Sequence, residues 1–156
     1  MQSLLDATQP KGRRYYWQSE YLSRIAPELC GKVVEHAARI RSPHSAVVLF
    51  QIGGALNRVE EERSAAGNRD ARYVINLAGS WEKADDDEKN IARAREAWSD
   101  MRSFSTAGTY INFLTEDEGP ERIAAALGKG LKRLAEVKGR WDSQNVFRTN
   151  RNVAPV

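Results

Sequence analysis

The segment Arg72–Ala78 reads RYVINLA, and its alternation decides the predicted fold. Successive side chains of a strand point to opposite faces of a sheet, so three large apolar side chains share one face: Tyr73, Ile75 and Leu77. Asn76 falls on the other face, together with Val74. We therefore predict a strand with one apolar face for packing and a second face that carries a polar amide.

Three other segments have the residue types of strands. Residues 46–52, AVVLFQI, form a nearly continuous apolar run with β-branched side chains, which predicts a strand covered on both faces. Residues 13–17 are rich in aromatic side chains and predict a short first strand. Residues 109–114, TYINFL, predict a last strand in which Tyr110 and Asn112 share a face.

Helical patterns separate these strands. After Pro27, which suits the first position of a helix, apolar residues recur every three or four positions to Ile40. A second pattern ends at Met101, and at its start Asp85 and Glu88 resemble a capping box. The order predicts an α+β fold, in which an antiparallel sheet with helices on one face forms a ferredoxin-like βαββαβ core. C-terminal helices and an irregular tail follow this core.

The composition is that of one ordinary globular domain. The chain has 156 residues, with 24 Lys and Arg against 21 Asp and Glu, a net charge of +3, and 41% apolar residues. We assign residues 13–156 to a single domain and residues 1–12 to a flexible lead-in. Charges of both signs are scattered along the chain, so we predict no nucleic-acid partner.

Several kinds of site are excluded by residue counts. A single cysteine, Cys30, excludes an internal disulfide, and two histidines are too few for most metal sites, so we predict no bound metal. No apolar run approaches the roughly 20 residues of a membrane helix, and no signal-peptide pattern is present. We therefore expect a cytoplasmic protein without a membrane partner.

Polar side chains within the predicted strands are the candidate functional residues. Asn76 and Asn112 lie among apolar neighbours, where asparagine is depleted, and Tyr110 adds a hydroxyl. A buried amide needs hydrogen-bond partners or it destabilises the fold by about 1–3 kcal/mol. The three groups could line a surface for a polar ligand, or they could pair with one another or with water.

Five motifs, in the same order along the chain, resemble the C-terminal third of the berberine-bridge-enzyme-like FAD-linked oxidases, which are vanillyl-alcohol-oxidase type flavoenzymes. The longest motif is LKRLAEVKGRWDSQNVFRTNRNVAP, residues 131–155, which is similar to the closing signature of that family. The others are YYWQSEYL, FQIGGALNRV, NRDARYVINLAGSW and GTYINFL. The resemblance covers residue 13 to the end.

The resemblance implies a division of labour between two domains. In that family, an N-terminal domain binds FAD, and a second domain with an antiparallel sheet covers the isoalloxazine ring and forms the substrate pocket. The present chain resembles only the later part of this covering domain. It contains no flavin-linking His motif and no pyrophosphate-binding loop, so the resemblance implies FAD binding only together with a complementary FAD-binding domain.

The resemblance also implies roles for five residues. Asn76 matches a position that is often Gln or Glu and acts as a base in some members, and Tyr110 is the only phenol on the matching flavin-facing strand, so we assign both as catalytic. Asn112 matches a position near the flavin, and Asn150 and Asn152 lie where the tail returns to it. Several positions depart from the pattern. The amide of Asn76 cannot accept a proton as a carboxylate does, Phe113 replaces a common Tyr, Asn68 replaces the usual His, and Gly130-Leu131 replaces the usual Asn-Tyr.

Two functions follow as hypotheses. In the first, the chain covers the substrate and flavin of an FAD-dependent oxidase of alcohol or sugar-like substrates, works with a separate FAD-binding chain, and is colourless and inactive alone. In the second, the chain is a stand-alone interaction module that forms a homo-oligomer through its sheet, without redox activity. A small-molecule enzyme that uses Tyr110 alone is a third, weaker alternative.

Overall fold

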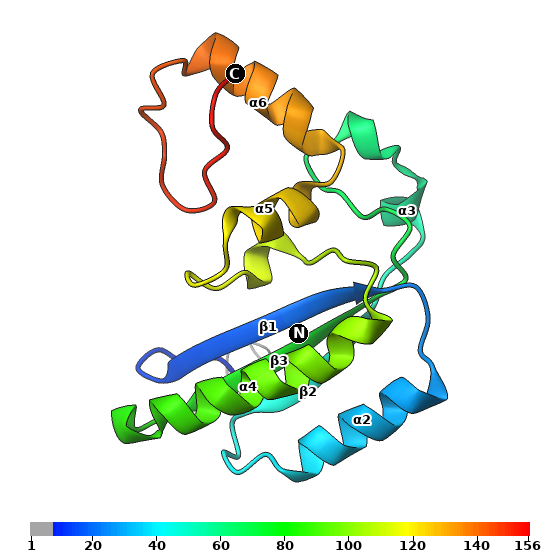
Figure 1. Cartoon of the computed structure of the whole chain (residues 1–156), viewed down its shortest axis with the longest axis vertical. Helices are drawn as coiled ribbons and strands as arrows, with labels where there is room; N and C mark the ends of the chain where they lie inside the picture. Colours follow the sequence, from blue (N-terminus) through cyan, green and yellow to red (C-terminus); the bar gives the residue numbers. More distant parts are fainter. Residues whose placement is uncertain (1–7) are drawn as a thin grey trace.

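The computed structural model describes residues 8–156 and contains one three-stranded antiparallel sheet. Its strands are β1 (Arg14–Leu22), β2 (Ala46–Gln51) and β3 (Tyr73–Trp81), in the spatial order β1-β3-β2. Figure 1 shows helices lying along this sheet and a C-terminal part beyond its β1 edge. The predicted α+β class, with an antiparallel sheet, is confirmed. Most of the predicted lead-in, residues 1–7, lies outside the described residues.

Two helices cover one face of the sheet. They are α2 (Pro27–Ala38) and α4 (Asp87–Met101), which lie side by side in Figure 1, with α4 contacting β1 and β3 and α2 contacting β2. Between them and the sheet is a cluster of buried apolar side chains: Leu22, Ala26, Leu29, Ile75, Leu77, Ala97 and Met101. The apolar faces of α2, α4 and β3 therefore meet in this cluster, while Ile91 and Ala94 of α4 pack in a second cluster with Tyr16 and Trp81.

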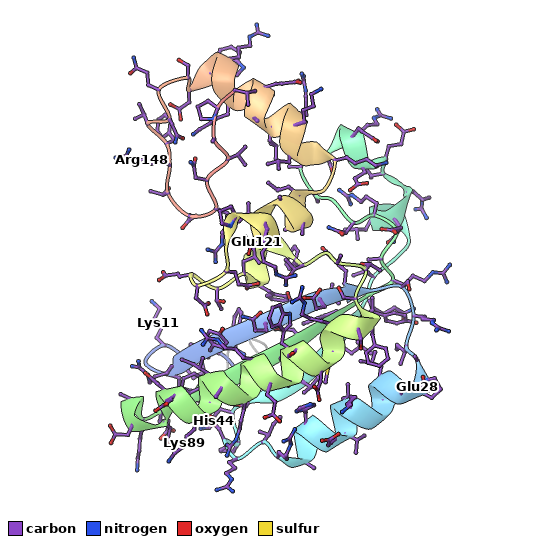
Figure 2. The ribbon with its side chains drawn as sticks, in the orientation of Figure 1. Lys11, Glu28, His44, Lys89, Glu121 and Arg148 are labelled. Atoms are coloured by element: carbon purple, nitrogen blue, oxygen red, sulfur yellow. The ribbon has the colours of Figure 1, made fainter. Side chains whose placement is uncertain are left out.

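The remaining helical elements are shorter or lie further from the sheet. The helices are α3 (Ala55–Arg58), α5 (Pro120–Leu127) and α6 (Gly130–Trp141). Short 3-10 turns are found at Glu61–Arg63, Ala84–Asp86, Arg102–Phe104 and Ile111–Phe113. Charged side chains such as those of Lys89 and Arg148 project from the periphery of the molecule (Figure 2).

The strand register separates the two faces of the sheet as the alternation of β3 predicted. Ile75 is paired with Glu20 on β1 and Leu49 on β2, and these residues face the helices. Asn76 is paired with Ser19 and Val48, so it belongs to the opposite face. We call this opposite side, turned away from α2 and α4, the open face.

The predicted last strand, residues 109–114, is wrong. The outer edge of β1 is already occupied before this segment, because the Tyr21 N–H donates to the Gly108 carbonyl and its carbonyl accepts from the Thr106 N–H, both at 2.9 Å. The chain then turns instead of extending, and the N–H of Phe113 donates to the carbonyl of Tyr110 at 2.8 Å. The aromatic rings of these two residues pack edge to face, 5.2 Å apart, which favours the turn over a strand.

The strand over residues 46–52 forms, but it is not covered on both faces. β2 is an edge strand that pairs only with β3 among the described residues, and Leu49 and Phe50 are each 43% exposed. An apolar edge of this kind normally pairs with another strand or is shielded by other elements. The first strand, by contrast, is longer than the predicted 13–17 and extends to Leu22.

The predicted capping box at the start of α4 is also wrong. Asp85 lies in a 3-10 turn, and the helix begins at Asp87 without a side-chain capping hydrogen bond. Asp87 instead accepts hydrogen bonds from the Arg14 guanidinium and, at 2.7 Å, from the Trp81 indole. These bonds lower the pKa of the Asp87 carboxyl, and they attach the start of α4 to the ends of β1 and β3.

A buried ionic network joins α5 to the sheet, and no sequence pattern predicted it. The guanidinium of Arg122 lies 2.9 Å from the Glu20 carboxylate and 2.8 Å from that of Glu118. The side chains of Glu20, Glu118 and Arg122 are only 2%, 7% and 11% exposed. The Trp98 indole donates a further hydrogen bond, of 2.7 Å, to Glu20. Each buried charge thus has its partners, which is the condition for burying it at all.

A second polar cluster lies beside this network. The Tyr16 hydroxyl donates to Asp117 at 2.8 Å, and the Arg95 guanidinium donates to both residues. Partial burial acts to raise the pKa of Asp117, but hydrogen bonds from Thr115, Arg95 and Tyr16 outweigh it and lower the pKa to about 2. Asp117 is therefore ionised at neutral pH and holds the segment before α5 against β1 and α4.

Candidate functional site

The open face is the surface to which the sequence assigned Asn76. Its strand residues follow from the register: Tyr15, Trp17, Ser19 and Tyr21 of β1, Ala46, Val48 and Phe50 of β2, and Val74, Asn76, Ala78 and Ser80 of β3. Four aromatic residues lie on this face, Tyr15, Trp17, Tyr21 and Phe50, and the helix-facing side of the same strands carries Tyr16, Tyr73 and Trp81 beside its aliphatic residues.

One ring from outside the sheet packs on the open face. The ring of Phe113 lies 5.8 Å from that of Trp17 and 5.9 Å from that of Phe50. Trp17 comes from β1 and Phe50 from β2, on either side of β3, so Phe113 spans β3 in the region of Asn76. This placement explains why Asn76 is only 4% exposed although no helix within residues 8–156 packs on its face as α2 and α4 do on the other.

Three buried side-chain polar atoms of this face lack hydrogen-bond partners among residues 8–156. They are Oδ1 of Asn76, an acceptor, Nε1 of Trp17, a donor, and the hydroxyl Oγ of Ser80. Leaving such a group unpaired destabilises a protein by about 1–3 kcal/mol, so most buried polar groups are paired. These atoms are buried as the structure stands, so a planar, hydrogen-bonding ligand would reach them only if the side chains that cover them moved aside.

Tyr110 and Asn112 are brought together directly. The amide Nδ2 of Asn112 donates to the hydroxyl of Tyr110 at 2.8 Å, and the hydroxyl keeps its own proton for another acceptor. Tyr110 is 38% exposed. Burial raises the pKa of Tyr21 on β1, and the proximity of Tyr110 raises it further, so the two phenols lie near each other.

The C-terminal tail returns to the same segment. The guanidinium of Arg151 donates to the carbonyl of Leu114, one residue after the turn that carries Phe113. Asn150 is exposed with a left-handed φ of 58°, a conformation that asparagine tolerates, and Asn152 is half-buried. The structure therefore places both predicted tail residues beside Arg151, close in sequence to the contact with Leu114.

The sequence reasoning missed Trp17, Phe50 and Arg151 as parts of this site. If the first strand had been predicted to extend to Leu22, its period-two spacing would have assigned Tyr15, Trp17 and Tyr21 to the same face. Nothing local marks Arg151, since its partner is a backbone carbonyl 37 positions earlier.

The described residues contain neither a cluster of metal ligands nor a membrane-spanning helix. Within residues 8–156, no three His, Cys, Asp or Glu side chains converge as metal ligands would. Over the same residues, no helix combines the length and apolar character needed to cross a membrane.

Comparison with known proteins gives one family and a consistent set of relatives. Residues 109–154 match the protein-family model described as berberine and berberine like. An aclacinomycin-N/aclacinomycin-A oxidase of Streptomyces galilaeus is 30% identical over 126 residues, 70% of this chain and 23% of the oxidase. An FAD-linked oxidoreductase of Dictyostelium discoideum is 22% identical over 158 residues, 100% of this chain and 34% of that protein. The chain thus spans about a quarter to a third of the length of these relatives.

Solved structures show the same fold. The BBE-like #28 protein of Arabidopsis thaliana matches 94% of this chain and 34% of its own, with a TM-score of 0.84 at 16% identity. A flavoenzyme involved in shunt product recycling in caerulomycin biosynthesis matches 94% of this chain and 33% of its own, with a TM-score of 0.81 at 26% identity.

Proposed function

Residues 109–154 match the family model described as berberine and berberine like, and from this match we propose that the chain is the substrate-binding and flavin-covering part of an FAD-dependent oxidoreductase. Its proposed partner is a separate FAD-binding domain, because the chain spans only about a third of the FAD-linked oxidoreductase of Dictyostelium discoideum. Without that partner the chain is expected to be inactive. The proposed substrate is a small alcohol or sugar-like molecule.

The observation that carries this proposal is the unpaired donor and acceptor on the aromatic open face. An isoalloxazine ring is flat and carries hydrogen-bond donors and acceptors along one edge. It could stack on the exposed rings of this face and would pair with Trp17 Nε1 and Asn76 Oδ1 once the side chains that bury these atoms move aside. Asn112 of the neighbouring turn, and Asn150 and Asn152 of the tail, are the proposed further contacts. The phosphates of FAD have no comparable site on this face.

The residues of the chain have limited but definite chemical roles in this proposal. FAD, when bound, supplies the redox chemistry by accepting a hydride from the substrate. The amide of Asn76 can orient a substrate hydroxyl but cannot accept its proton. Tyr110, whose oxygen already accepts from Asn112, can donate a hydrogen bond to a substrate oxygen and orient it, and the hydroxyl proton that the oxidation releases would pass to water. Phe113 excludes water from the region of Asn76.

Titration with flavin fragments tests the proposal. Lumiflavin has the flavin ring but lacks the ribityl and ADP parts of FAD. If the chain contacts only the ring, both compounds should bind weakly and quench the fluorescence of Trp17, with dissociation constants that differ less than about threefold. A Trp17→Phe variant should lose most of that quenching. If FAD bound stoichiometrically and far more tightly than lumiflavin, the chain would contain a binding site for the phosphates of FAD, and this result would contradict the proposal.

Replacing Asn76 by valine is expected to stabilise the isolated chain by about 1 kcal/mol, because it removes an unpaired buried acceptor and introduces a strand-favouring residue. The same change should weaken lumiflavin binding. Ser80→Ala is the matched control, since Ser80 also has an unpaired buried oxygen on the open face of β3 but lies outside the aromatic cluster. Ser80→Ala should stabilise the isolated chain by a similar amount and leave lumiflavin binding unchanged. Loss of stability in Asn76→Val would mean that the amide is satisfied in the folded chain.

Self-association is a second candidate function, and the exposed edge of β2 favours it. Val47 to Phe50 form an apolar edge with no neighbouring strand among the described residues. Sedimentation of the purified chain should then show a dimer that Leu49→Lys converts to a monomer, because charge on an edge strand opposes pairing. A monomeric wild-type chain would remove this candidate and leave the first one intact.

A further inference from the structure

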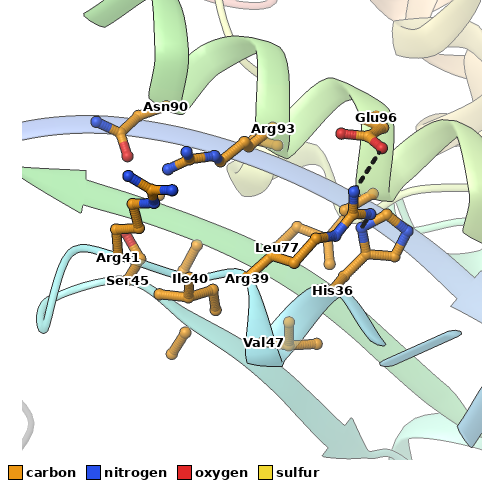
Figure 3. Close-up of a pocket in the computed structure, with 15 residues that line it drawn as sticks. His36, Arg39, Ile40, Arg41, Ser45, Val47, Leu77, Asn90, Arg93 and Glu96 are labelled. Carbon is orange, nitrogen blue, oxygen red and sulfur yellow. Dashed lines mark hydrogen bonds and ion pairs between the residues drawn. The ribbon is translucent and has the colours of Figure 1, made fainter. Parts of the chain in front are cut away.

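A small cleft lies on the helix-covered side of the sheet, away from the open face. It is formed by the end of α2, the following loop, β2, β3 and the first half of α4, and its volume is about 90 Å³ (Figure 3). None of the residues assigned above to flavin or substrate lines it: Asn76, Tyr110, Asn112, Asn150 and Asn152. The cleft is therefore independent of the proposed function.

The floor of the cleft is apolar. It is formed by the side chains of Ile40, Val47, Leu77, Ala94 and Ala97. An apolar cavity of about 150 Å³ holds a benzene molecule, so this smaller cleft suits an aliphatic group of roughly three or four carbon atoms. Burial of such a group would remove apolar surface from water on both ligand and protein.

The rim of the cleft carries three arginines that differ in their partners. Arg39 is engaged, because its guanidinium lies 2.9 Å from the Glu96 carboxylate and also hydrogen-bonds to His36. Arg41 and Arg93, in contrast, have no carboxylate within 4.0 Å in the part of the chain that the structure describes. Figure 3 shows their two guanidinium groups next to each other at the mouth of the cleft.

Two adjacent cations without a counter-ion favour an anion between them. Arg41 follows α2 and Arg93 belongs to α4, so an anion between their side chains would be held from two elements at once. Guanidinium groups recognise carboxylates through paired, charge-assisted hydrogen bonds. The charged mouth and the apolar floor together select a ligand with an anionic head and a short aliphatic tail.

We propose that this cleft binds a short-chain aliphatic carboxylate, with the carboxylate between Arg41 and Arg93 and the hydrocarbon tail on Val47, Leu77 and Ala94. Bare inorganic anions would leave the apolar floor empty, and neutral molecules of the same shape would leave the two guanidinium groups unpaired. Affinity in the roughly millimolar range is expected for a ligand of so few atoms.

The test is a titration of the isotope-labelled full chain, followed by NMR at Val47, Leu77 and Ala94. The probes are butyrate, butyramide, which has the same tail without charge, and acetate, which has the charge with almost no tail. Butyrate should shift these signals and bind at least about 10-fold more tightly than either analogue, the effect of a charge-assisted pair. Equal binding of acetate or of butyramide, or no shifts with butyrate, would overturn the proposal.

Variants locate the binding groups. Arg41→Gln and Arg93→Gln should each weaken butyrate binding by about 10-fold or more, while Arg133→Gln on α6, whose side chain is 73% exposed, should leave it unchanged. Circular dichroism of each variant verifies that it is folded. If Arg41→Gln and Arg93→Gln bound butyrate as tightly as the wild-type chain, the proposed site would be wrong. A failure of the flavin ring to bind at the open face would leave this proposal unaffected.

Discussion

Replacing Arg122 by alanine is expected to lower the free energy of unfolding by about 3–5 kcal/mol. The change removes the cation that neutralises Glu20, a carboxylate 2% exposed between β1, α4 and α5, and leaves that charge buried without its ionic partner. For a chain of this length the loss corresponds to a melting temperature lower by roughly 6–20 °C. Urea denaturation followed by circular dichroism measures it.

A second substitution tests the cause of this loss. In a Glu20→Gln background, Arg122→Ala should be less harmful, because Glu118 is then the only buried carboxylate of this network that loses its cationic partner, instead of two. Arg133→Ala is the surface control, since its ion pair with Glu136 is long, 3.8 Å, and exposed, and it should leave stability almost unchanged. Equal losses for Arg122→Ala in both backgrounds would mean that the guanidinium acts through packing alone.

Truncation of Leu22 to alanine is expected to destabilise the chain by about 2–5 kcal/mol. Leu22 is fully buried where the end of β1 meets α2 and α4, and the packed core around it has little freedom to fill a cavity. Chemical denaturation should show a lower midpoint with an unchanged slope, since the surface exposed on unfolding hardly changes.

Val34→Ala on α2 is the matched control for this cavity. Val34 is an aliphatic residue that is 68% exposed, so its truncation should change stability by less than about 0.5 kcal/mol. A small effect at Leu22, comparable to that at Val34, would show that the packing of α2 and α4 on the sheet is not the core of this fold.

The sequence predicted the parts of the fold that local patterns control. The alternation around Asn76 assigned the two faces of β3, and the apolar spacing after Pro27 predicted α2. Failures occurred where a distant segment decides the outcome. Residues 109–114 have strand propensity, but residues 105–108 already hold the edge of β1. The ionic network of Arg122 could not be predicted either, because Glu20 lies 102 positions away along the chain.

The candidate site was predictable in its residue types but not in its geometry. Asparagine among apolar strand residues identified Asn76, and the structure places it on the predicted face without a partner for its oxygen. The hydrogen bond between Asn112 and Tyr110 depends on a turn that the alternation did not predict. Trp17 and Phe50 join the site only through the ring of Phe113, a tertiary contact that no periodicity encodes.

The most direct test compares the flavin content of the purified chain with that of the same chain fused behind the FAD-binding part of a relative. The chain alone should have no visible flavin absorbance after gel filtration, and the fusion should retain about one FAD per polypeptide. Retention of one FAD per molecule by the chain alone would contradict the account, because the open face would then have to be part of a complete dinucleotide site.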